Sequence, residues 1–285
     1  MSIPYQQHQQ PPFPQAQGGQ LGTYTSPIAV RQATFKDALA SEWTKIRSVR
    51  STVWTLGVLL VVLLGVGLLF AFLVGSGDQM GTGVPALAYG AFGVIVGSLC
   101  VITLGVLTIS SEYGTGMIRP TLTACPSRGR ILAAKSVVFF LLSFAIVTIG
   151  ATVVAVIHNA KLTYGPPPTG EEWLLATVGI GLYVAMLGLL SLAVGALIRH
   201  SAGAIAIMIG VVLLPLVFAM FMYAEPLTGV RNFLMNYSIP SQMIAMYGTS
   251  PGSAGPSGWD SLWIITGITA AALGGAYFAL KSRDA

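Results

Sequence analysis

Few side chains in this 285-residue chain have the type and spacing needed to make or break bonds. The three histidines, His8, His158 and His200, lie far apart, and no His-Glu-x-x-His or similar metal-ligand spacing occurs. Cys100 falls within an apolar stretch and Cys125 in a polar segment, so the two are not expected to meet. We therefore predict no metal site and no disulfide, and we expect each histidine to be structural or solvated.

The lysines lack the context for nucleotide binding. A phosphate-binding loop contains Gly-Lys-Ser or Gly-Lys-Thr, and none of the five lysines follows a glycine. We predict that the chain is not an enzyme, binds no cofactor and has no ATP site of its own.

The composition predicts a membrane protein. Hydrophobic residues make up 54% of the chain and charged residues 8%, against about 45–50% and about 25% in soluble domains. Six stretches near the length that spans hydrocarbon contain no Lys, Arg, Asp or Glu: Val53–Val74, Ala86–Ile109, Ser136–Ile157, Trp173–Ile198, Ala202–Tyr223 and Leu262–Leu280. Because lipid offers no partner for backbone polar groups, we predict an all-α polytopic protein with six transmembrane helices.

The basic residues predict the orientation of these helices. An even number of spans places both termini on one side, and cytoplasmic loops carry the excess of Lys and Arg. Twelve basic residues fall on the side of the termini and two, Lys161 and Arg231, on the other. We predict a plasma-membrane protein with cytoplasmic termini, and anionic membrane lipid rather than nucleic acid as the partner of its basic residues.

The N-terminal residues differ from the rest of the chain. Residues 1–30 contain no Lys, Arg, Asp or Glu and are rich in Gln and Pro, a composition that cannot bury a core. We predict a disordered cytoplasmic tail over residues 1–32 and a membrane domain over residues 33–285.

An amphipathic helix on the membrane surface is predicted over residues 33–50, just before the first span. Thr34 and Asp37 have the spacing of a capping box at its start. Apolar residues recur at spacings of four, four, three and three, and so share one face: Phe35, Leu39, Trp43, Ile46 and Val49. The basic residues are expected to face lipid phosphates, with Trp43 at the interface.

A second cytoplasmic segment joins the second and third predicted spans. Glu112 lies where the second helix leaves the membrane, and Gly114 and Gly116 allow the chain to bend. One interpretation is a basic inner loop that only satisfies the topology. The other is a docking lever whose exposed carboxylate and arginines pair with a soluble partner, with a short helix before Pro126.

Together these two segments resemble permease subunits of bacterial type-2 ATP-binding-cassette (ABC) exporters. The resemblance covers residues 34–285 and rests on two motifs, Ser41–Ser48 (SEWTKIRS) and Ser111–Arg119 (SEYGTGMIR). In that family the first motif is similar to the connecting helix and the second to the coupling region that touches the ATPase subunit. The resemblance therefore implies two sets of site residues: Glu42, Trp43, Lys45 and Arg47 on the interfacial helix, and Glu112, Tyr113, Gly114, Thr115, Gly116 and Arg119 in ATPase coupling.

The resemblance also implies partners. Unlike full-length relatives, the chain is expected to have no fused nucleotide-binding domain, so we expect separate ATPase subunits that carry ATP and Mg, and a second permease copy that forms a homodimer. Substrate is expected to move along the dimer interface in the direction of export. Because the spans are uncharged, an apolar or amphipathic substrate is favoured.

Residues 224–259 form an outer loop that is long for a simple connection. It keeps many apolar residues that would be poorly placed in solvent: Phe233, Leu234, Met235, Ile239, Met243, Ile244 and Met246. We predict a re-entrant segment before the last span, with short helices separated at Pro240 and Gly248. Family members are similar in this respect.

Two other classes of function stay open at this point. An intramembrane enzyme would need catalytic side chains within the spans, where the sequence supplies only hydroxyls and scattered polar groups. A non-transporting membrane scaffold or sensor would need only helix packing, which the abundant glycines provide. The glycines expected to pack closely are Gly93, Gly97, Gly181, Gly188, Gly274 and Gly275.

Overall fold

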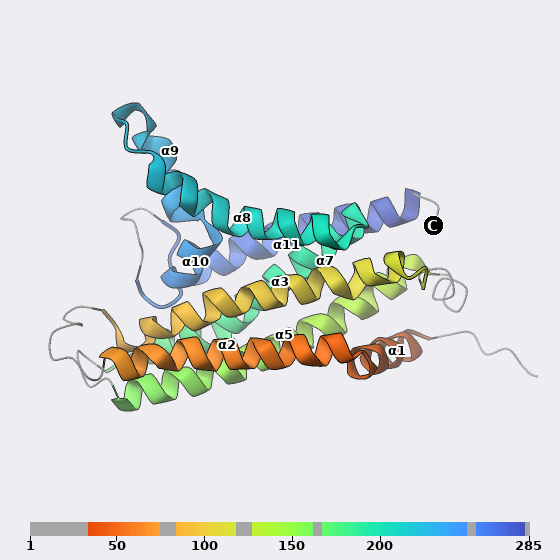
Figure 1. The fold of residues 1–285 in the computed structure, drawn as a ribbon, viewed down its shortest axis with the longest axis horizontal. Coiled ribbons are helices and arrows are strands. Elements are labelled where there is room, and N and C mark those ends of the chain that lie inside the picture. Colours follow the sequence, from red (N-terminus) through yellow and green to blue (C-terminus); the bar gives the residue numbers. More distant parts are fainter. Residues whose placement is uncertain (1–33, 75–83, 118–126, 162–166, 250–254, 283–285) are drawn as a thin grey trace, which may run out of the picture. The chain divides into compact units, whose positions relative to one another are not determined.

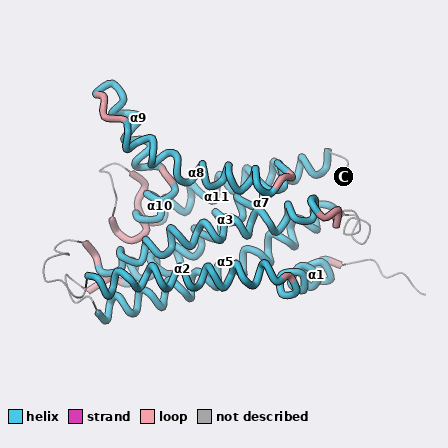
Figure 2. Tube along the Cα trace, in the orientation of Figure 1, coloured by secondary structure: helices cyan, strands magenta, loops and turns pink. Residues whose placement is uncertain are grey.

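The computed structural model describes residues 34–74, 84–117, 127–161, 167–249 and 255–282. All regular structure in these ranges is helical (Figures 1 and 2). The predicted tail over residues 1–32 lies outside the described residues. Its boundary with a membrane domain at residues 33–285 stays a prediction.

Six helices in the described ranges are long and apolar enough to cross a membrane, as predicted. They are α2 (Arg50–Val74); η1 (Ala86–Tyr89) with α3 (Gly90–Gly114); α5 (Arg128–Lys161); α6 (Gly170–Leu174), η2 (Leu175–Gly179) and α7 (Ile180–Ile198) in one run; α8 (Ser201–Phe221); and α11 (Trp259–Ser282). Most begin or end beyond the predicted charge-free stretches, because polar residues can continue a helix outside the hydrocarbon. The clearest case is α5, which includes the charged residues at both of its ends.

The helix α7 lies at the centre of the bundle. It packs against α3, α5, α8 and α11, and most of its residues are buried. The π-helical turn η2 precedes it within the same run and also contacts α5 and α11. Figure 1 shows α3, α5 and α11 running alongside α7.

Glycines allow the closest helix contacts. A Cβ atom on Gly105 of α3 would collide with the carbonyl oxygen of Gly188 of α7, and one on Gly93 would meet the Leu63 carbonyl oxygen of α2 at 2.5 Å. The predicted packing role is therefore confirmed for Gly93 and Gly188. No described residue lies within 4 Å of a Cβ added to Gly274 or Gly275, so these two glycines make no close contact within one copy of the chain, and a packing role for them stays a prediction.

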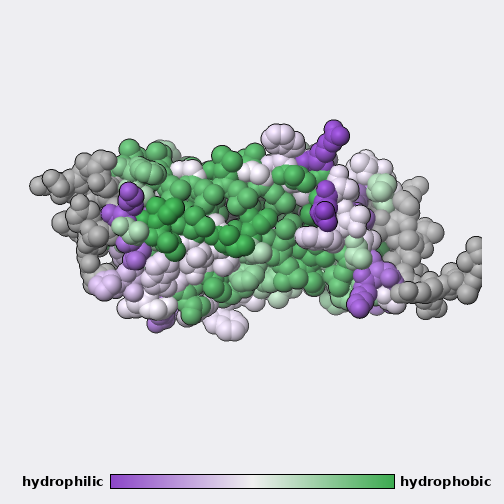
Figure 3. Space-filling view, turned by 90° about the horizontal axis from the view of Figure 1, so that it is seen from below, coloured by the Kyte–Doolittle hydropathy of each residue, from purple (hydrophilic) through white to green (hydrophobic). Residues whose placement is uncertain are grey.

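Many apolar side chains face outward from the bundle. Trp54 is 75% exposed, Trp263 73% and Phe221 78%. On the face seen in Figure 3, hydrophobic residues form a band between hydrophilic residues near both ends. This is the surface that lipid or another apolar helix would cover.

The loop before α11 holds short helices, as predicted. After η3 (Glu225–Leu227) come α9 (Thr228–Tyr237) and α10 (Ile239–Ala245), which are separated at Ser238. Pro240 lies in the first turn of α10, and Gly248, with φ of 75°, follows its end. The predicted separation points are therefore displaced, because proline is tolerated in the first turn of a helix.

The burial of these short helices explains part of their apolar composition. Met243 and Met246 are fully buried, whereas Phe233 on α9 is 59% exposed. The α10 segment contacts α3, α8 and α11. Protein thus covers α10, and a re-entrant path through the bilayer stays a prediction.

Candidate functional site

The helix α1 (Phe35–Ser48) begins with the predicted capping box. The Thr34 amide donates to Asp37 Oδ2 at 2.8 Å, and the Asp37 amide donates to Thr34 Oγ1 at 3.4 Å. Val49 has an extended backbone that ends α1 and lets α2 begin at Arg50 in a new direction (Figure 1). As a result α1 packs against α5 and α2 at one end of the bundle.

The orientation of α1 differs from the simple expectation that an apolar stripe faces the protein interior. Phe35, Trp43 and Val49 of the predicted apolar stripe are all more than 40% exposed. The one residue of α1 that is buried is an acid, Glu42, at 3% exposure. The helix therefore turns a carboxylate inward, and contact of its apolar side with lipid stays a prediction.

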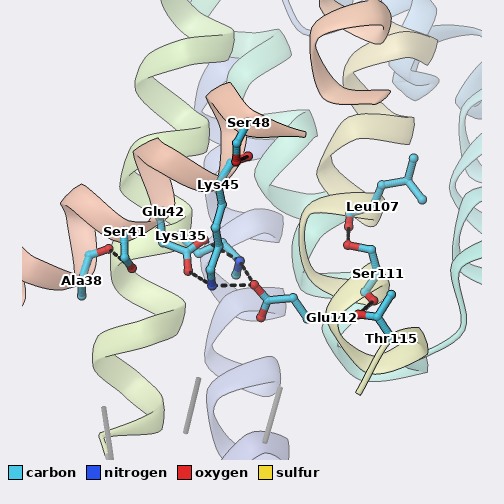
Figure 4. A network of polar contacts seen from close by, with 10 residues as sticks. All are labelled: Ala38, Ser41, Glu42, Lys45, Ser48, Leu107, Ser111, Glu112, Thr115 and Lys135. Carbon is cyan, nitrogen blue, oxygen red and sulfur yellow. Dashed lines mark hydrogen bonds and ion pairs between the residues drawn. The ribbon is translucent and has the colours of Figure 1, made fainter. Parts of the chain in front are cut away.

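Four charged side chains meet where α1, α3 and α5 come together, and we call them the charge cluster: Glu42, Lys45, Glu112 and Lys135. The Lys45 ammonium lies 2.8 Å from Glu42 Oε1 and 2.9 Å from Glu112 Oε1. The Lys135 ammonium lies 2.6 Å from Glu42 Oε2 and 2.9 Å from Glu112 Oε1. Figure 4 shows both lysines between the two carboxylates. The cluster thus connects three helices through ion pairs.

Because these ion pairs are buried, breaking them is expected to affect the stability of the protein strongly. Lys135 is 2% exposed and Glu112 8%, and the side chain of Lys45 is 33% exposed. Two acids and two bases leave no formal net charge, so the cost of removing the charges from water is offset by mutual attraction and hydrogen bonds. Removing one member leaves an opposite charge buried without its partner, which is strongly destabilising.

The pKa of Lys45 shows the balance of these effects. Partial burial, the largest single contribution, lowers the pKa of Lys45, but hydrogen bonds to Glu112 and Glu42 together outweigh it. The net result is a pKa above the usual 10.5. Lys45 is therefore charged throughout the physiological range.

Comparison with known families identifies the chain. A model of the family described as ABC-2 family transporter protein matches residues 9–285, nearly the whole chain. The chain belongs to the ABC-2 transporter family. It is therefore a multi-pass membrane protein and a permease component of an ABC transporter, a role that requires association with an ATPase subunit. A comparison with curated proteins found no match.

In this ABC-2 permease, Glu112 is not the exposed carboxylate that the sequence suggested. That expectation is wrong, because Lys45 and Lys135 hold the Glu112 carboxylate inside the charge cluster. One of the arginines expected to face a soluble partner is also engaged within the permease. Arg128 donates to the carbonyl oxygen of Leu280 at 2.6 Å.

The remaining residues of the predicted coupling segment follow Glu112 at the end of α3. The guanidinium of Arg199 lies 5.0 Å from the centre of the Tyr113 ring, a cation–π contact. Thr115 caps the helix, and its hydroxyl donates to the Ser111 carbonyl at 2.8 Å. Gly116 has φ of 71°, so the chain bends there as predicted. Arg119 and the predicted short helix before Pro126 lie outside the described residues.

Sequence reasoning missed the role of Lys135. It was counted only as one of the basic residues of the cytoplasmic side. A signal was present, because Glu42 and Glu112 are acids on the predicted basic side and each needs a cation. The sequence did not show that Lys135 supplies this cation, because Lys135 is 93 positions from Glu42 and 23 positions from Glu112.

The histidines have structural roles in the described residues. His158 is fully buried at one end of α5, with Nε2 2.9 Å from the Gly67 carbonyl oxygen. His200 caps α8, and its Nδ1 accepts from the Gly203 amide at 3.0 Å. No group of three His, Cys, Asp or Glu side chains in the described ranges is placed to hold a metal.

Proposed function

We propose that this permease exports an apolar or amphipathic substrate, driven by separate ATPase subunits that dock on its cytoplasmic loops. Two sequence features support the proposal. None of the five lysines in these 285 residues has a phosphate-loop context, so ATP is bound elsewhere in the transporter. The six spans contain no charged residue in their central stretches, which suits an apolar substrate better than a small ion.

The charge cluster is the observation that carries the mechanism. It ties α1 to the end of α3, where the predicted coupling segment begins with Glu112, and to the beginning of α5. A push on the coupling segment would therefore move the ends of three helices together. Ion pairs of this kind resist separation because each charge would lose oppositely charged partners in a low-dielectric environment.

Conformational change then follows from helix packing. ATP-driven closure of the ATPases would displace α1 and the end of α3 as a unit, and α3 would shift against α7. The close contact of Gly105 with Gly188 leaves little room for adjustment there, so the displacement would be passed to the central helix. We propose that this alternates the permease between inward- and outward-open states.

The same proposal includes topology and assembly. Twelve basic residues on one side and two on the other support cytoplasmic termini, which puts the charge cluster at the cytoplasmic end. The exposed apolar side chains of α2, α8 and α11 are available for contact with a second permease copy and with lipid.

Co-purification tests the proposal directly. The tagged permease would be extracted with candidate ATPase subunits from its own cell and reconstituted in lipid nanodiscs. We expect a stoichiometric complex that hydrolyses ATP. Absence of any ATPase partner under several extraction conditions would instead favour a membrane scaffold or sensor.

Variants of the cluster test the mechanism. Glu112→Arg would place three cations around one acid, and we expect loss of ATPase docking or of stimulated hydrolysis. Because this variant also strains folding, Lys45→Met provides a milder break of the link between α1 and α3. Lys36→Met on the exposed side of α1 is the matched control. Unchanged ATPase docking and hydrolysis in Glu112→Arg and Lys45→Met would refute the proposal that the coupling segment and α1 act as a docking lever.

A further inference from the structure

We propose that a cavity beside the charge cluster binds an amphiphile whose polar head carries uncharged hydrogen-bond donors, such as hydroxyl or amide groups. The cavity has a volume of about 360 Å³ and lies between α1, the first turns of α2 and the last turns of α3. It is partly open, and its size falls within the range of small-molecule sites. The proposal concerns binding to the permease and does not depend on transport.

Three of the hydroxyl groups that line the cavity, those of Thr55, Thr108 and Ser111, act as acceptors. On α3, Thr108 Oγ1 donates to the Leu104 carbonyl at 2.7 Å and Ser111 Oγ donates to the Leu107 carbonyl at 2.6 Å. Thr55 on α2 bonds its own helix in the same way, at 2.8 Å. Because each hydroxyl proton is already used, the remaining lone pairs of these oxygens can only accept hydrogen bonds.

Glu112 also lines the cavity and has an acceptor without a partner in the described part of the chain. Its Oε1 pairs with both lysines, but its Oε2 is buried and has no hydrogen-bond partner among the described residues. Figure 4 shows this second oxygen without a hydrogen bond or ion pair to the other residues drawn, whereas the other oxygen of the same carboxylate is joined to both ammonium groups. An unpaired carboxylate oxygen in a buried setting is costly, and a donor from a ligand would relieve that cost.

The charges of the cluster determine which kind of ligand hydrogen-bond donor can bind beside Glu112. The cluster already contains two ammonium groups, and both lie 2.9 Å from the other oxygen of the Glu112 carboxylate. A ligand ammonium would add a third cation and be repelled by both lysines, whereas an anion would face the acceptor oxygens. An uncharged hydroxyl or amide group satisfies the acceptors and leaves the balance of two acids and two bases intact.

The rest of the lining suits an apolar body. Ile46 of α1, Val49 directly after α1, and Leu104 and Leu107 of α3 line the same cavity. An aliphatic chain against these residues would leave its polar head toward Ser111 and Glu112. This division between an acceptor-rich end and an apolar wall indicates a neutral amphiphile.

The probe is 1-decanoylglycerol, which has two hydroxyl groups and no charge. A photoreactive diazirine analogue would be added to the full-length permease in nanodiscs without ATPase, and labelled peptides mapped by mass spectrometry. Competitors share the ten-carbon chain: 1-decanoylglycerol itself, decylamine, decanoate and methyl decanoate, which has no donor. We expect labelling of α1, α2 and α3, with competition by 1-decanoylglycerol alone.

Variants make the test specific to the cavity. Thr108→Val combined with Ser111→Ala removes two acceptors, and we expect about a thirtyfold loss of affinity at about 1 kcal/mol for each hydrogen bond. Leu107→Trp fills the cavity and should abolish labelling. Thr103→Val is the matched control, because Thr103 donates to the Leu99 carbonyl on the same helix but does not line the cavity.

Several results would overturn the proposal. They are equal competition by all four compounds, labelling concentrated on other helices, and equal loss in Thr103→Val and the double variant. Folding of each variant is checked by its thermal unfolding. Because no ATPase is present, failure here would leave the proposed transport function untouched, and failure to find an ATPase would leave this site untouched.

Discussion

Short helices close the two ends of the bundle by different physical means. At one end α1 inserts Glu42 and Lys45 into the charge cluster. At the other end α10 is buried through apolar contacts and neutral polar groups (Figure 1). There Gln242 Nε2 donates to the Tyr237 carbonyl at 2.8 Å, and burial raises the pKa of Tyr247, which keeps it neutral.

This difference indicates how well each end can transmit a mechanical displacement. Buried ion pairs give α1 a defined position, because any displacement separates opposite charges in a low-dielectric environment. Apolar packing with neutral hydrogen bonds resists motion more gradually, since contacts are lost a few at a time. The charged end is therefore the better candidate for passing on a mechanical input from an ATPase.

The largest effect is expected at the most buried cation of the cluster. Lys135→Met would leave Glu42 Oε2 without its partner and Glu112 with one lysine. We expect a loss of roughly 3–5 kcal/mol in the free energy of unfolding. Thermal unfolding of the purified protein in detergent measures it, and a loss below about 1 kcal/mol would contradict the account of the charged end.

A smaller effect is expected at the neutral end. Gln242→Leu removes the bond to the Tyr237 carbonyl and the weaker one from the Tyr183 hydroxyl, whose oxygen lies 3.4 Å away. Leaving these buried groups unpaired should cost roughly 1–3 kcal/mol. The same unfolding assay applies, and a cost equal to or above that of Lys135→Met would remove the contrast between the ends.

The half-buried lysine of the cluster should matter less. Lys45→Met deprives Glu42 Oε1 of its partner, but Glu112 keeps Lys135. We expect a loss of about 1–2 kcal/mol, reduced by solvent screening at a side chain that is 33% exposed.

The pH dependence sharpens this prediction. The folded-state pKa of Lys45 is raised above its usual 10.5, so its contribution is present in full below that value and is lost as the pH rises through the folded pKa. Unfolding of wild type and Lys45→Met should therefore differ by the same amount at pH 7 and pH 9. A difference that shrinks over that interval would be inconsistent with the raised pKa.

The smallest effect is expected outside the cluster. Lys36 is exposed on α1, and Lys36→Gln should change stability by no more than about 0.5 kcal/mol. If this substitution cost as much as Lys45→Met, general charge on α1 rather than the buried pairs would explain the results.

Local features of this protein could be read from the sequence. Six apolar stretches without charge predicted the spans, since length and hydropathy decide which segments enter lipid. The capping box of Thr34 and Asp37 was predicted because its partners lie three residues apart. These signals are contained in short windows of the chain.

Features that depend on tertiary contacts could not be read in this way. Glu42 and Lys135 meet across 93 positions, and hydropathy does not say which helix ends come together. For the same reason Glu112 was expected at the surface, whereas in the structure it is buried and paired with two lysines. The burial of Met243 in α10 likewise depends on helices from elsewhere in the chain.

Chemical restoration of one charge tests the central claim, that the charge cluster couples ATPase action to the helices. Lys45→Cys would be made with Cys100→Ser and Cys125→Ser, and the permease combined with its ATPase in nanodiscs. A 2-aminoethyl methanethiosulfonate adduct restores an ammonium group at residue 45, whereas methyl methanethiosulfonate adds a neutral group of similar chemistry. We predict that stimulated ATP hydrolysis is lost in Lys45→Cys and recovers only with the amine. Full stimulation before treatment, or equal recovery with both reagents, would contradict the claim.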